Sequence, residues 1–407
     1  MLETAKPTTK SEQTAAIQQQ PSESRLDPIS GNWTVFAPHR GRRPEEFVHD
    51  QDRVKRRVEC PFCPGNESTT PPAVWIGRVS DDDSGFDILA PAALSQSPRA
   101  NVRPADDDCP GQHLCASGEW SVRVVPNKFP AVGSSAVQHA GMDQPTIDSM
   151  RAAPRDAHLF ESAPLTGGHE VVIESRNHVQ SFTELDVSEA HLVFKAYRDR
   201  LKYWRSVPGV AYISTFKNVG GSAGASLRHT HSQIIATDRI PPAISHSFDR
   251  MVRYRANRGC CLQCDLVRAE LKAKQRIVWR DGSLLAYCPF ASRLPMLVRI
   301  TTLEHQPCFE DMKDDTIESV SRLAGRVVSW LESLHPGIAY NFCLHTRPPG
   351  ASDPPDAYHW SIEIFPRMTQ VAGFEWSSQC MINPVLPEHA ASKLRACALA
   401  EDPRIML

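Results

Sequence analysis

The sequence has 407 residues, of which 41% are hydrophobic and 23% are charged, and its formal net charge is −2 at pH 7. This composition is that of a globular protein long enough for roughly two to three domains. The balanced charge argues against a nucleic-acid partner. Because no apolar run reaches the ~18 residues that a membrane span needs, we expect no membrane partner either.

The first 25 residues are polar and rich in Gln, Ser and Thr, with no apolar core of the kind found in a secretory signal. Such a segment has too little apolar surface to bury, so we expect residues 1–25 to form a disordered tail. Without an export signal we expect a cytoplasmic protein, in which clustered cysteines bind metals more often than they form disulfides.

Short strands separated by Pro- and Gly-rich turns are predicted in the first half of the chain from β-branched content and alternation. The clearest candidates are residues 30–38, 120–126, 169–175, 209–218 and 231–236. Helical periodicity predicts a helix over 183–207, with Thr183 as its N-cap. The acidic, Pro-rich residues 80–118 are expected to form a long surface excursion.

The second half of the chain repeats this order of elements. Residues 276–290 predict a hairpin, and a strand then leads into His305, with Phe309 four residues later, just as His178 is followed by Phe182. A helix predicted over 316–335 and a further strand complete the repeat. We therefore predict an α+β fold built from a duplicated unit, with boundaries at 26–240 and 241–396.

Each half also contains a Cys-x-x-Cys pair and two histidines at matching offsets. His229 follows His178 by 51 residues, and His359 follows His305 by 54. The two predicted ligand sets are Cys60, Cys63, His178 and His229 in the first half, and Cys261, Cys264, His305 and His359 in the second. Sets of four N and S ligands suit structural zinc, so we expect two Zn²⁺ ions per chain. In the second set, His345 competes with His305 as the third ligand.

The segment SLRHTHSQIIA, residues 226–236, directly follows the glycine-rich run FKNVGGSAGA. Strand alternation places His229, His231 and Gln233 on one face. With His229 tied to zinc, His231 is held rigidly, and a neutral imidazole so held is a good nucleophile for phosphorus. The glycines would let backbone N–H groups close around phosphate oxygens, and Gln233 can donate to an oxygen on which charge develops. As a bare pattern, His-x-His-x-Gln also fits a metal-binding strand or a core strand.

FKN followed by GASLRHTHSQIIA resembles the active-site segment of the galactose-1-phosphate uridylyltransferases, a family of the histidine-triad superfamily that includes an ADP-glucose phosphorylase-like branch. The similarity covers nearly all of residues 26–396. It includes DPISGNWTVFAPHRGRRP, CPFCPGNE, VVPNKFPAV, HEVVIESRNH, YHWSIEIFPR and AGFEWSSQCMINPVLPEHAASKLR. The resemblance implies two histidine-triad-like halves, each an antiparallel sheet with flanking helices, which agrees with the repeat. We also expect a homodimer.

By matching position, the resemblance implies a role for each of several residues. His231 would be the nucleophile that accepts the nucleotidyl group, and Gln233 would stabilise the phosphoryl oxygens. The implied substrate-binding residues are Arg40 and Arg43 at the phosphates, Asn127 and Lys128 near the ribose and base, Asn218 at the nucleotide, Ser226 at a phosphate and Glu375 at the sugar.

The implied reaction moves a nucleoside monophosphate from a nucleotide sugar, UDP-glucose, to a hexose 1-phosphate, galactose 1-phosphate, through a covalent nucleotidyl-histidine. An alternative within the family is ADP-glucose phosphorylase, which moves AMP from ADP-glucose to inorganic phosphate. HTHSQ and the second pair, CLQC, are similar to that branch, and Met381 stands where galactose-specific members carry a glutamine.

A different class of protein, a non-enzymatic zinc-knuckle binding module, would also account for both Cys-x-x-Cys pairs. Such a module would carry a basic face with stacking aromatic side chains. The charge of this chain is balanced and only 7% of its residues are Phe, Trp or Tyr. The sequence therefore favours the enzyme.

Overall fold

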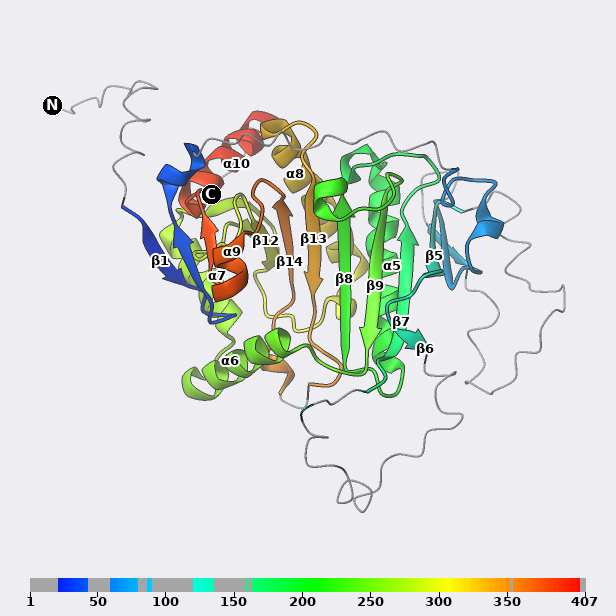
Figure 1. The fold of residues 1–407 in the computed structure, drawn as a ribbon, viewed down its shortest axis with the longest axis horizontal. Coiled ribbons are helices and arrows are strands. Elements are labelled where there is room, and N and C mark those ends of the chain that lie inside the picture. Colours follow the sequence, from blue (N-terminus) through cyan, green and yellow to red (C-terminus); the bar gives the residue numbers. More distant parts are fainter. Residues whose placement is uncertain are drawn as a thin grey trace, which may run out of the picture.

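The computed structural model describes residues 21–42, 59–79, 86–89, 120–134, 159, 163–351 and 354–402. Most of its strands join one large sheet (Figure 1). The strands are β1 (Glu23–Leu26), β2 (Trp33–Phe36), β3 (Trp75–Val79), β4 (Phe86–Leu89), β5 (Val122–Pro126), β6 (Gly133–Ser134), β7 (Thr166–Ile173), β8 (Tyr212–Val219), β9 (His231–Thr237), β10 (Ile277–Asp281), β11 (Leu284–Tyr287), β12 (Val298–Thr302), β13 (Tyr340–His345), β14 (Ser361–Pro366) and β15 (Met381–Asn383). The helices are α5 (Val187–Ser206), α6 (Pro242–Arg258), α7 (Leu262–Ala273), α8 (Asp314–Leu334), α9 (Gly373–Ser378) and α10 (Pro387–Glu401).

The two halves of the chain are joined edge to edge. Within the described residues the large sheet has 12 strands, in the order β10-β11-β12-β14-β13-β8-β9-β7-β5-β3-β4, with β6 beside β7. Strand β13 of the second half pairs antiparallel with β8 of the first, with Tyr340 opposite Val219 and Leu344 opposite Thr215. The predicted α+β fold with two antiparallel sheets and flanking helices is confirmed, and the two sheets are continuous through this seam.

The predicted duplication is visible in the order of the elements. Strand β7, helix α5 and strands β8 and β9 of the first half are followed in the second half by β12, α8, β13 and β14 in the same order. The strand pairs correspond too, because Val171 on β7 lies opposite Gln233 on β9, and Arg299 on β12 lies opposite Glu363 on β14.

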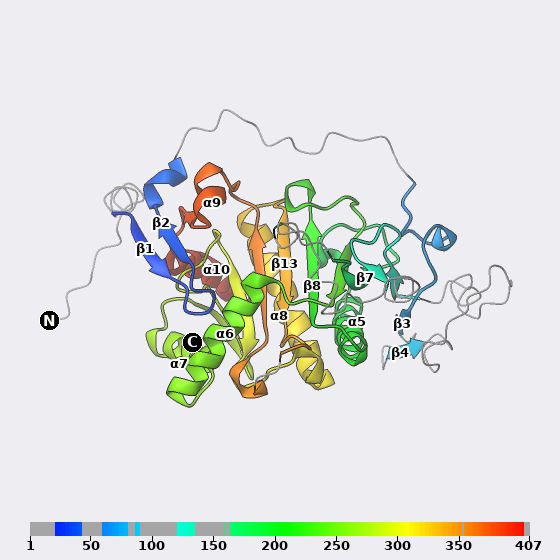
Figure 2. The same ribbon diagram turned by 60° about the horizontal axis from the view of Figure 1, so that its bottom comes forward.

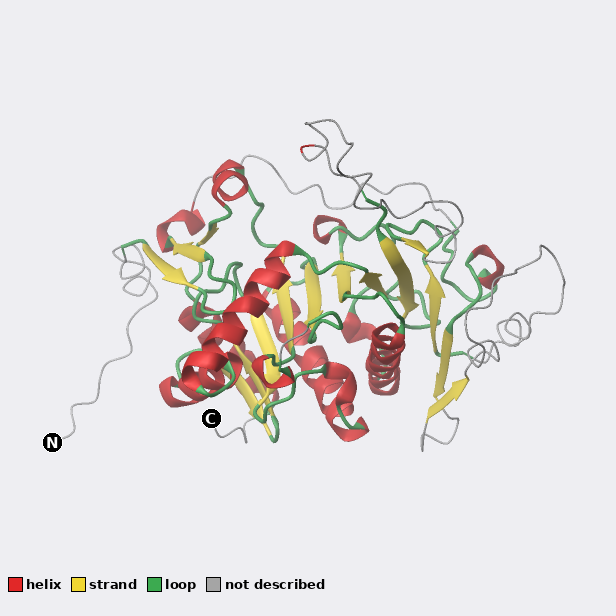
Figure 3. Ribbon diagram, turned by 90° about the horizontal axis from the view of Figure 1, so that it is seen from below, coloured by secondary structure: helices red, strands yellow, loops and turns green. Residues whose placement is uncertain are grey.

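One face of the sheet is covered by helices and the other is partly open. Leu192 and Phe194 of α5 and Val327 and Leu331 of α8 are fully or almost fully buried in the main core. Viewed from below, helices pack along one side of the large sheet, whereas loops lie along much of the other (Figures 2 and 3). Strand β8 alternates accordingly between buried residues and the half-exposed Tyr212, Ser214, Phe216 and Asn218. The open face is therefore where side chains can meet a ligand.

The N-terminal segment crosses to the second half of the molecule. Strand β1 begins at Glu23, so the fold starts before the predicted boundary at residue 26, while residues 1–20 lie outside the described residues. Strands β1 and β2 form a separate three-stranded sheet with β15. Arg25 fixes this segment through an ion pair with Glu388 of α10 (2.9 Å) and a cation–π contact with Phe290 (4.5 Å). The first two strands of the N-terminal half proposed from sequence thus pack with the second half.

Helix α5 begins later than predicted. Val187 is its first residue, and the backbone N–H of Asp186 donates to the carboxylate of Glu189 (3.3 Å), as in a capping box. Thr183 is wrong as the N-cap because it lies in a preceding 3-10 turn, where its hydroxyl donates to Glu332 of α8 (2.7 Å). Most of the predicted excursion 80–118 lies outside the described residues, although Phe86–Leu89 form the edge strand β4.

Among the described helices, none has a stretch both long and apolar enough to cross a membrane.

Candidate active site and metal clusters

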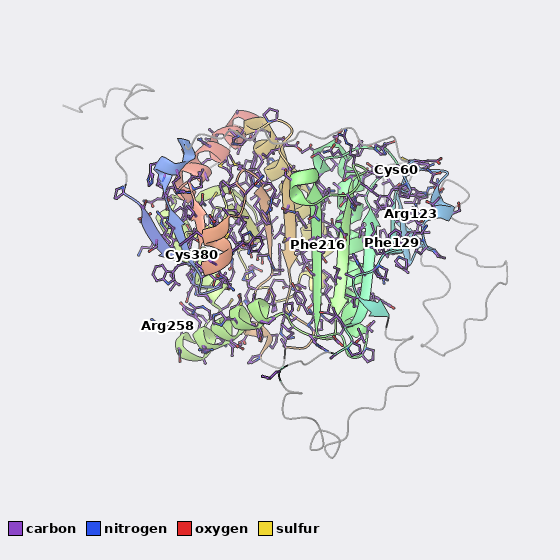
Figure 4. All side chains as sticks on the ribbon, in the orientation of Figure 1. Cys60, Arg123, Phe129, Phe216, Arg258 and Cys380 are labelled. Carbon is purple, nitrogen blue, oxygen red and sulfur yellow. The ribbon has the colours of Figure 1, made fainter. Side chains whose placement is uncertain are left out.

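Strand β9 places the predicted nucleophile on the open face of the sheet. Register pairs Ile173 with His231, and Val171 and Phe216 with Gln233, so the side chains of these residues share that face. Phe216 lies near the middle of the face, and Phe129 lies toward its β5 side (Figure 4). The predicted placement of His231 and Gln233 on one face of a strand is therefore confirmed, whereas His229 lies before the start of β9.

The hydrogen bond of His231 determines which ring nitrogen can react. Its Nδ1 lies 2.7 Å from the carbonyl oxygen of His229, and a carbonyl can only accept, so Nδ1 carries the proton and Nε2 keeps its lone pair. The ring is 6% exposed, and burial lowers the pKa of His231, with the positive charge of Lys217 adding to the effect. The imidazole is thus neutral near pH 7 and presents Nε2 as a nucleophile.

Phe62, between the two cysteines of CPFC, connects the first cysteine pair to this histidine. Its ring is buried and lies 5.4 Å from the ring of His231 and 6.0 Å from that of His229, measured between centroids. The loop that carries Cys60 and Cys63 therefore also packs against the predicted nucleophile. The sequence analysis did not single out Phe62, although its position inside the Cys-x-x-Cys pair was the available signal.

The first predicted ligand set comes together. The ligand atoms of Cys60, Cys63, His178 and His229 all lie within 4.8 Å of one another. The Sγ of Cys63 is 3.2 Å from Nδ1 of His178 and 3.6 Å from Nδ1 of His229. His229 directs its other ring nitrogen, Nε2, to the carbonyl of Ser175 (2.9 Å), which leaves Nδ1 free for a metal. Burial lowers the pKa of His229 to about 4, which keeps it in the neutral form that binds metal.

The second set also comes together, and it contains His305. The ligand atoms of Cys261, Cys264, His305 and His359 lie within 4.8 Å of one another, and Nε2 of His359 is 2.8 Å from the hydroxyl of Thr302. Cys264 Sγ lies 3.4 Å from His305 Nδ1 and 3.5 Å from His359 Nδ1. The competing candidate, His345, lies instead 3.7 Å from the carboxylate of Glu363.

Both clusters fit a tetrahedral ion. Zn–S bonds of about 2.3 Å and Zn–N bonds of about 2.0–2.1 Å at the tetrahedral angle hold sulfur and nitrogen roughly 3.6 Å apart. The sulfur–nitrogen separations that involve Cys63 and Cys264 run from 3.2 to 3.6 Å. Each cluster can therefore hold a metal ion with four protein ligands.

Behind β9, on the covered face, lies a buried polar network. Lys217 donates to the carboxylate of Glu174, to the hydroxyl of Thr230 (2.7 Å) and to the backbone carbonyl of His231 (3.4 Å). Burial by itself opposes the charge of Glu174, but the ammonium group of Lys217 holds the pKa of Glu174 below its ordinary value. Tyr197 donates to the same carboxylate (3.1 Å). The bond from Lys217 to the carbonyl of His231 ties this network to the backbone of β9. Removing one partner would leave a buried charge unpaired.

Asn218, predicted to contact the nucleotide, lies on the open face of β8 and has a partner in the other half. Asn341 of β13 donates its Nδ2 group to Oδ1 of Asn218 (2.8 Å) and to the carbonyl of Ala223 (2.9 Å). The oxygen of Asn218 is thereby occupied and its amide nitrogen is left to donate. Asn341 is a site residue that the sequence analysis missed, because only the seam between the halves brings it there.

Three of the backbone amides predicted to cradle phosphate in the glycine-rich loop donate to the loop itself. The backbone N–H groups of Ala223, Gly224 and Ala225 donate to carbonyls of Gly220 and Gly221, within 3.0–3.2 Å, so they are not available to phosphate. Only glycine suits position 220, where the backbone has a positive φ of 83°. A Cβ at this position would also lie 2.7 Å from Cβ of Ala339, which is too close. The glycines thus close the loop on itself, and Ser226 beyond it is exposed.

Asn127 and Lys128 lie at the edge of the site and are engaged with protein groups. Asn127 accepts the N–H of Phe129 (2.9 Å) and places Nδ2 3.0 Å from Nε2 of His169. Lys128 donates to the carbonyl of Thr69 (3.3 Å), next to the first cysteine pair.

Arg40 and Glu375 are not brought to β9 within the chain. Arg40 is exposed in the 3-10 turn Pro38–Arg42, directly after β2, and Glu375 lies on α9, where it accepts the backbone N–H of Ala372 (3.1 Å). Both elements flank the small sheet on the second half, whereas β9 is separated from β14 by two further strands (Figure 1). Arg43 lies outside the described residues.

The chain is similar to known proteins in sequence and in structure. An ADP-glucose phosphorylase of Arabidopsis thaliana is 27% identical over 387 residues, covering 94% of this chain and 95% of the relative. A galactose-1-phosphate uridylyltransferase of Hypocrea jecorina is 24% identical over 402 residues, covering 92% of this chain and 95% of that one. The crystal structure of an Arabidopsis thaliana ADP-glucose phosphorylase with bound ADP-glucose matches with a TM-score of 0.69 and 25% identity, over 92% of this chain and 98% of that one.

The fold and the His-x-His-x-Gln strand therefore define a protein related to the galactose-1-phosphate uridylyltransferases and ADP-glucose phosphorylases, and an enzyme of the nucleotidyltransferase type. Residues 133–401 match the model of one family, and the chain belongs to it: "Domain of unknown function (DUF4921)".

Proposed function

We propose that the protein transfers a nucleoside monophosphate from a nucleotide sugar to a phosphate-bearing acceptor through a covalent intermediate on His231. The observation that carries this proposal is the hydrogen bond from Nδ1 of His231 to the carbonyl of His229 (2.7 Å), which leaves Nε2 as the reactive atom of a neutral, immobilised ring. In the first step Nε2 forms a bond to the α-phosphorus while the bond from that phosphorus to the bridging oxygen breaks. The sugar 1-phosphate leaves with the bonding electrons.

The second step reverses the first with a different acceptor. A phosphate oxygen attacks the same phosphorus, and the N–P bond breaks to return neutral His231. Phosphate groups leave readily as anions, so neither step needs a strong general acid. Gln233 donates to a non-bridging oxygen but cannot shuttle a proton, which favours transfer to another phosphate over transfer to water.

For the substrate we propose ADP-glucose, with inorganic phosphate as acceptor. This choice is supported by the 27% identity with an ADP-glucose phosphorylase over 94% of the chain and by the likeness to a structure that holds ADP-glucose. It is also supported by Met381, which lies in β15 where a galactose-specific enzyme would have a glutamine. UDP-glucose with galactose 1-phosphate as acceptor is the second candidate, favoured by the uridylyltransferase relatives.

We further propose that each Cys₂His₂ cluster holds a structural zinc ion. In the first half the ion would fix Cys60, Cys63, His178 and His229, and through His229 and Phe62 it would fix the ring of His231. With four protein ligands, neither ion has a position left for substrate.

The positions of Arg40 and Glu375 support a homodimer. These residues are expected to contact phosphate and sugar, yet they flank the small sheet on the second half of the chain, away from β9. We propose that they act at the site of a second copy, which a two-fold arrangement would allow. The exposed side chains of Phe374 and Trp376 on α9 lie beside Glu375 and are available to such an interface.

Radioactive labelling of the protein tests this proposal. The chain is incubated with ADP-glucose or UDP-glucose carrying ³²P at the α-phosphorus, denatured, and counted, and the labelled residue is located by mass spectrometry. We expect label from ADP-glucose on His231 that unlabelled phosphate discharges as ADP. Label taken only from UDP-glucose and discharged by galactose 1-phosphate would favour the second candidate. No label from either nucleotide sugar would contradict the covalent mechanism.

A further inference from the structure

The side-chain oxygen of Gln233 is held by a histidine on the neighbouring strand. Oε1 of Gln233 lies 2.8 Å from Nε2 of His169, which is on β7 and is 9% exposed. His169 lies opposite Ile235, one position along the same face from the pair of Val171 with Gln233, so the contact is a diagonal one across the two strands.

A backbone amide determines which nitrogen of His169 carries the proton. The N–H of Ala131 donates to Nδ1 of His169 (3.1 Å), and a backbone amide has no acceptor role, so Nδ1 must be bare. The ring proton is then on Nε2 and is donated to Gln233. The assignment rests on Ala131 alone, because the Nδ2 group of Asn127, whose oxygen is taken by Phe129, lies near both ring nitrogens, 3.4 Å from Nδ1. Nδ2 is also 3.0 Å from Nε2, a contact between two donors that we read as van der Waals rather than as a hydrogen bond.

The orientation of the Gln233 amide follows from this chain of donors. A primary amide has nearly the same shape when its oxygen and nitrogen are exchanged, but only its nitrogen can stabilise a phosphoryl oxygen. With Oε1 fixed on His169, the NH₂ group is the end that remains, and in the described part of the chain it donates to no protein group. We propose that His169 is a positioning residue that keeps the NH₂ group of Gln233 directed at the phosphoryl oxygens; this rests on the proposed function.

The second half of the molecule, which has no nucleophile, lacks this arrangement. The residue that corresponds to His169 there is Leu297, which is 2% exposed and packs beside Phe365. Glu363 stands at the position of Gln233, and its carboxylate accepts from Arg299 (2.6 Å). A donor chain of His169 and Gln233 is therefore found on the strands of the half that carries His231.

A double-mutant cycle tests the positioning role. His169→Met removes the donor and retains bulk, whereas His169→Gln can still donate from its amide near the position of Nε2. The rate of ³²P transfer to His231 is measured in single turnovers, and substrate affinity is measured separately. We expect His169→Met to slow labelling by about 10-fold to 10²-fold with little change in affinity, because a misdirected donor weakens stabilisation of the transition state. His169→Gln should recover most of the rate.

The effect of His169→Met is measured again in a protein that also carries Gln233→Ala. This comparison distinguishes a role that acts through Gln233 from any other role of His169. With Gln233→Ala present, His169→Met should slow labelling by less than about 2-fold, since a residue that acts through Gln233 has nothing left to position. Ile235→Val, directly across the strands from His169, is the control for altered packing and should leave the rate unchanged. An equal factor in both backgrounds would overturn the proposal.

A measurement independent of activity separates this proposal from the proposed function. In ¹⁵N NMR of the wild-type protein, with His169→Met used to assign the signals, we expect a protonated Nε2 and a bare Nδ1 for His169 near pH 7.5. The opposite tautomer would overturn the inference even in an active enzyme. A wild-type protein that takes no label but shows the expected tautomer would contradict the proposed function while leaving the donor chain in place.

Discussion

Each half of the molecule has its own Cys₂His₂ cluster, and the halves differ in the residues that follow the last histidine of that cluster. After His229, strand β9 carries His231 and Gln233, whereas after His359, strand β14 carries Ser361 and Glu363. Both of these cluster histidines direct Nε2 to an oxygen and Nδ1 to the cysteines. The two clusters are thus alike in geometry, and the proposed reactivity depends in addition on an imidazole two residues after the cluster histidine, which only the first half has at that position.

The residues packed around β9 and β14 also differ between the two halves. Lys217, paired with Glu174 behind β9, corresponds through its strand register to Leu344 behind β14. In front of β14, Arg299 and Glu363 form a buried ion pair where β7 and β9 have Val171 and Gln233. In the second half, Arg299 and Glu363 thus neutralise each other on the open face. The corresponding face of the first half has no such ion pair among its described residues and remains available to a ligand. Duplication therefore preserved the scaffold while the polar groups were redistributed.

The largest effect is expected from substitutions at corresponding positions of β9 and β14. His231→Gly should reduce exchange between a nucleotide sugar and labelled sugar 1-phosphate to the level of a protein-free control, because the covalent step has lost its nucleophile. Ser361→Ala, at the corresponding position of β14, should leave exchange within about 2-fold of wild type, since it removes no reacting group. Exchange at the wild-type rate by His231→Gly would remove β9 from the mechanism.

Mixed dimers test whether the second half contributes to its partner's site. His231→Gly and Glu375→Ala are each purified, mixed in equal amounts under conditions that exchange subunits, and assayed for exchange. If Glu375 acts in the other copy, random pairing leaves about a quarter of all sites intact and restores about that fraction of activity. Activity no higher than the sum of the separate variants would place Glu375 outside the partner's site.

The two clusters can be compared by replacing one cysteine in each of them. Cys60→Ser and Cys261→Ser should each remove about one of the two zinc ions expected per chain, by elemental analysis, and lower Tm by roughly 5 °C or more, about 2 kcal/mol for a domain of this size. Only Cys60→Ser should also slow labelling, because Phe62 and His229 of that cluster contact or support His231. Equal activity losses in both variants would mean that the clusters do not differ in function.

The smallest expected effect is that of pH on the first step. Burial lowers the pKa of His231, so the neutral ring persists below 6.5, the ordinary pKa of a histidine. The rate of labelling should therefore stay level as the pH falls through 6.5 and decline only in more acidic buffer, where Nε2 becomes protonated. A midpoint at or above 6.5, with the folded state intact by circular dichroism, would contradict a buried neutral nucleophile.

Local patterns in the sequence were sufficient to predict central strands such as β7, β8 and β9, the repeated order of elements, and both ligand sets, with His345 left as a competitor of His305 in the second. A period of two determines which face of β9 carries His231 and Gln233, and the histidine offsets repeat because the same elements lie between them. Glycines likewise indicate where a loop bends sharply, as Gly220 does with its positive φ. These features depend on residues close in sequence or on one repeated spacing. They can therefore be predicted from the sequence without the tertiary structure.

Only the tertiary structure showed which distant groups are hydrogen-bonded to one another. Asn341 reaches Asn218 because β13 pairs with β8 across the seam, and His169 reaches Gln233 because β7 lies beside β9 in one particular register. Three amides of the glycine loop, those of Ala223, Gly224 and Ala225, donate inside the loop, and an ion pair of Arg25 with Glu388 ties the first strand to the second half. Directional bonds between distant residues depend on register and packing of the whole sheet, which no local pattern encodes.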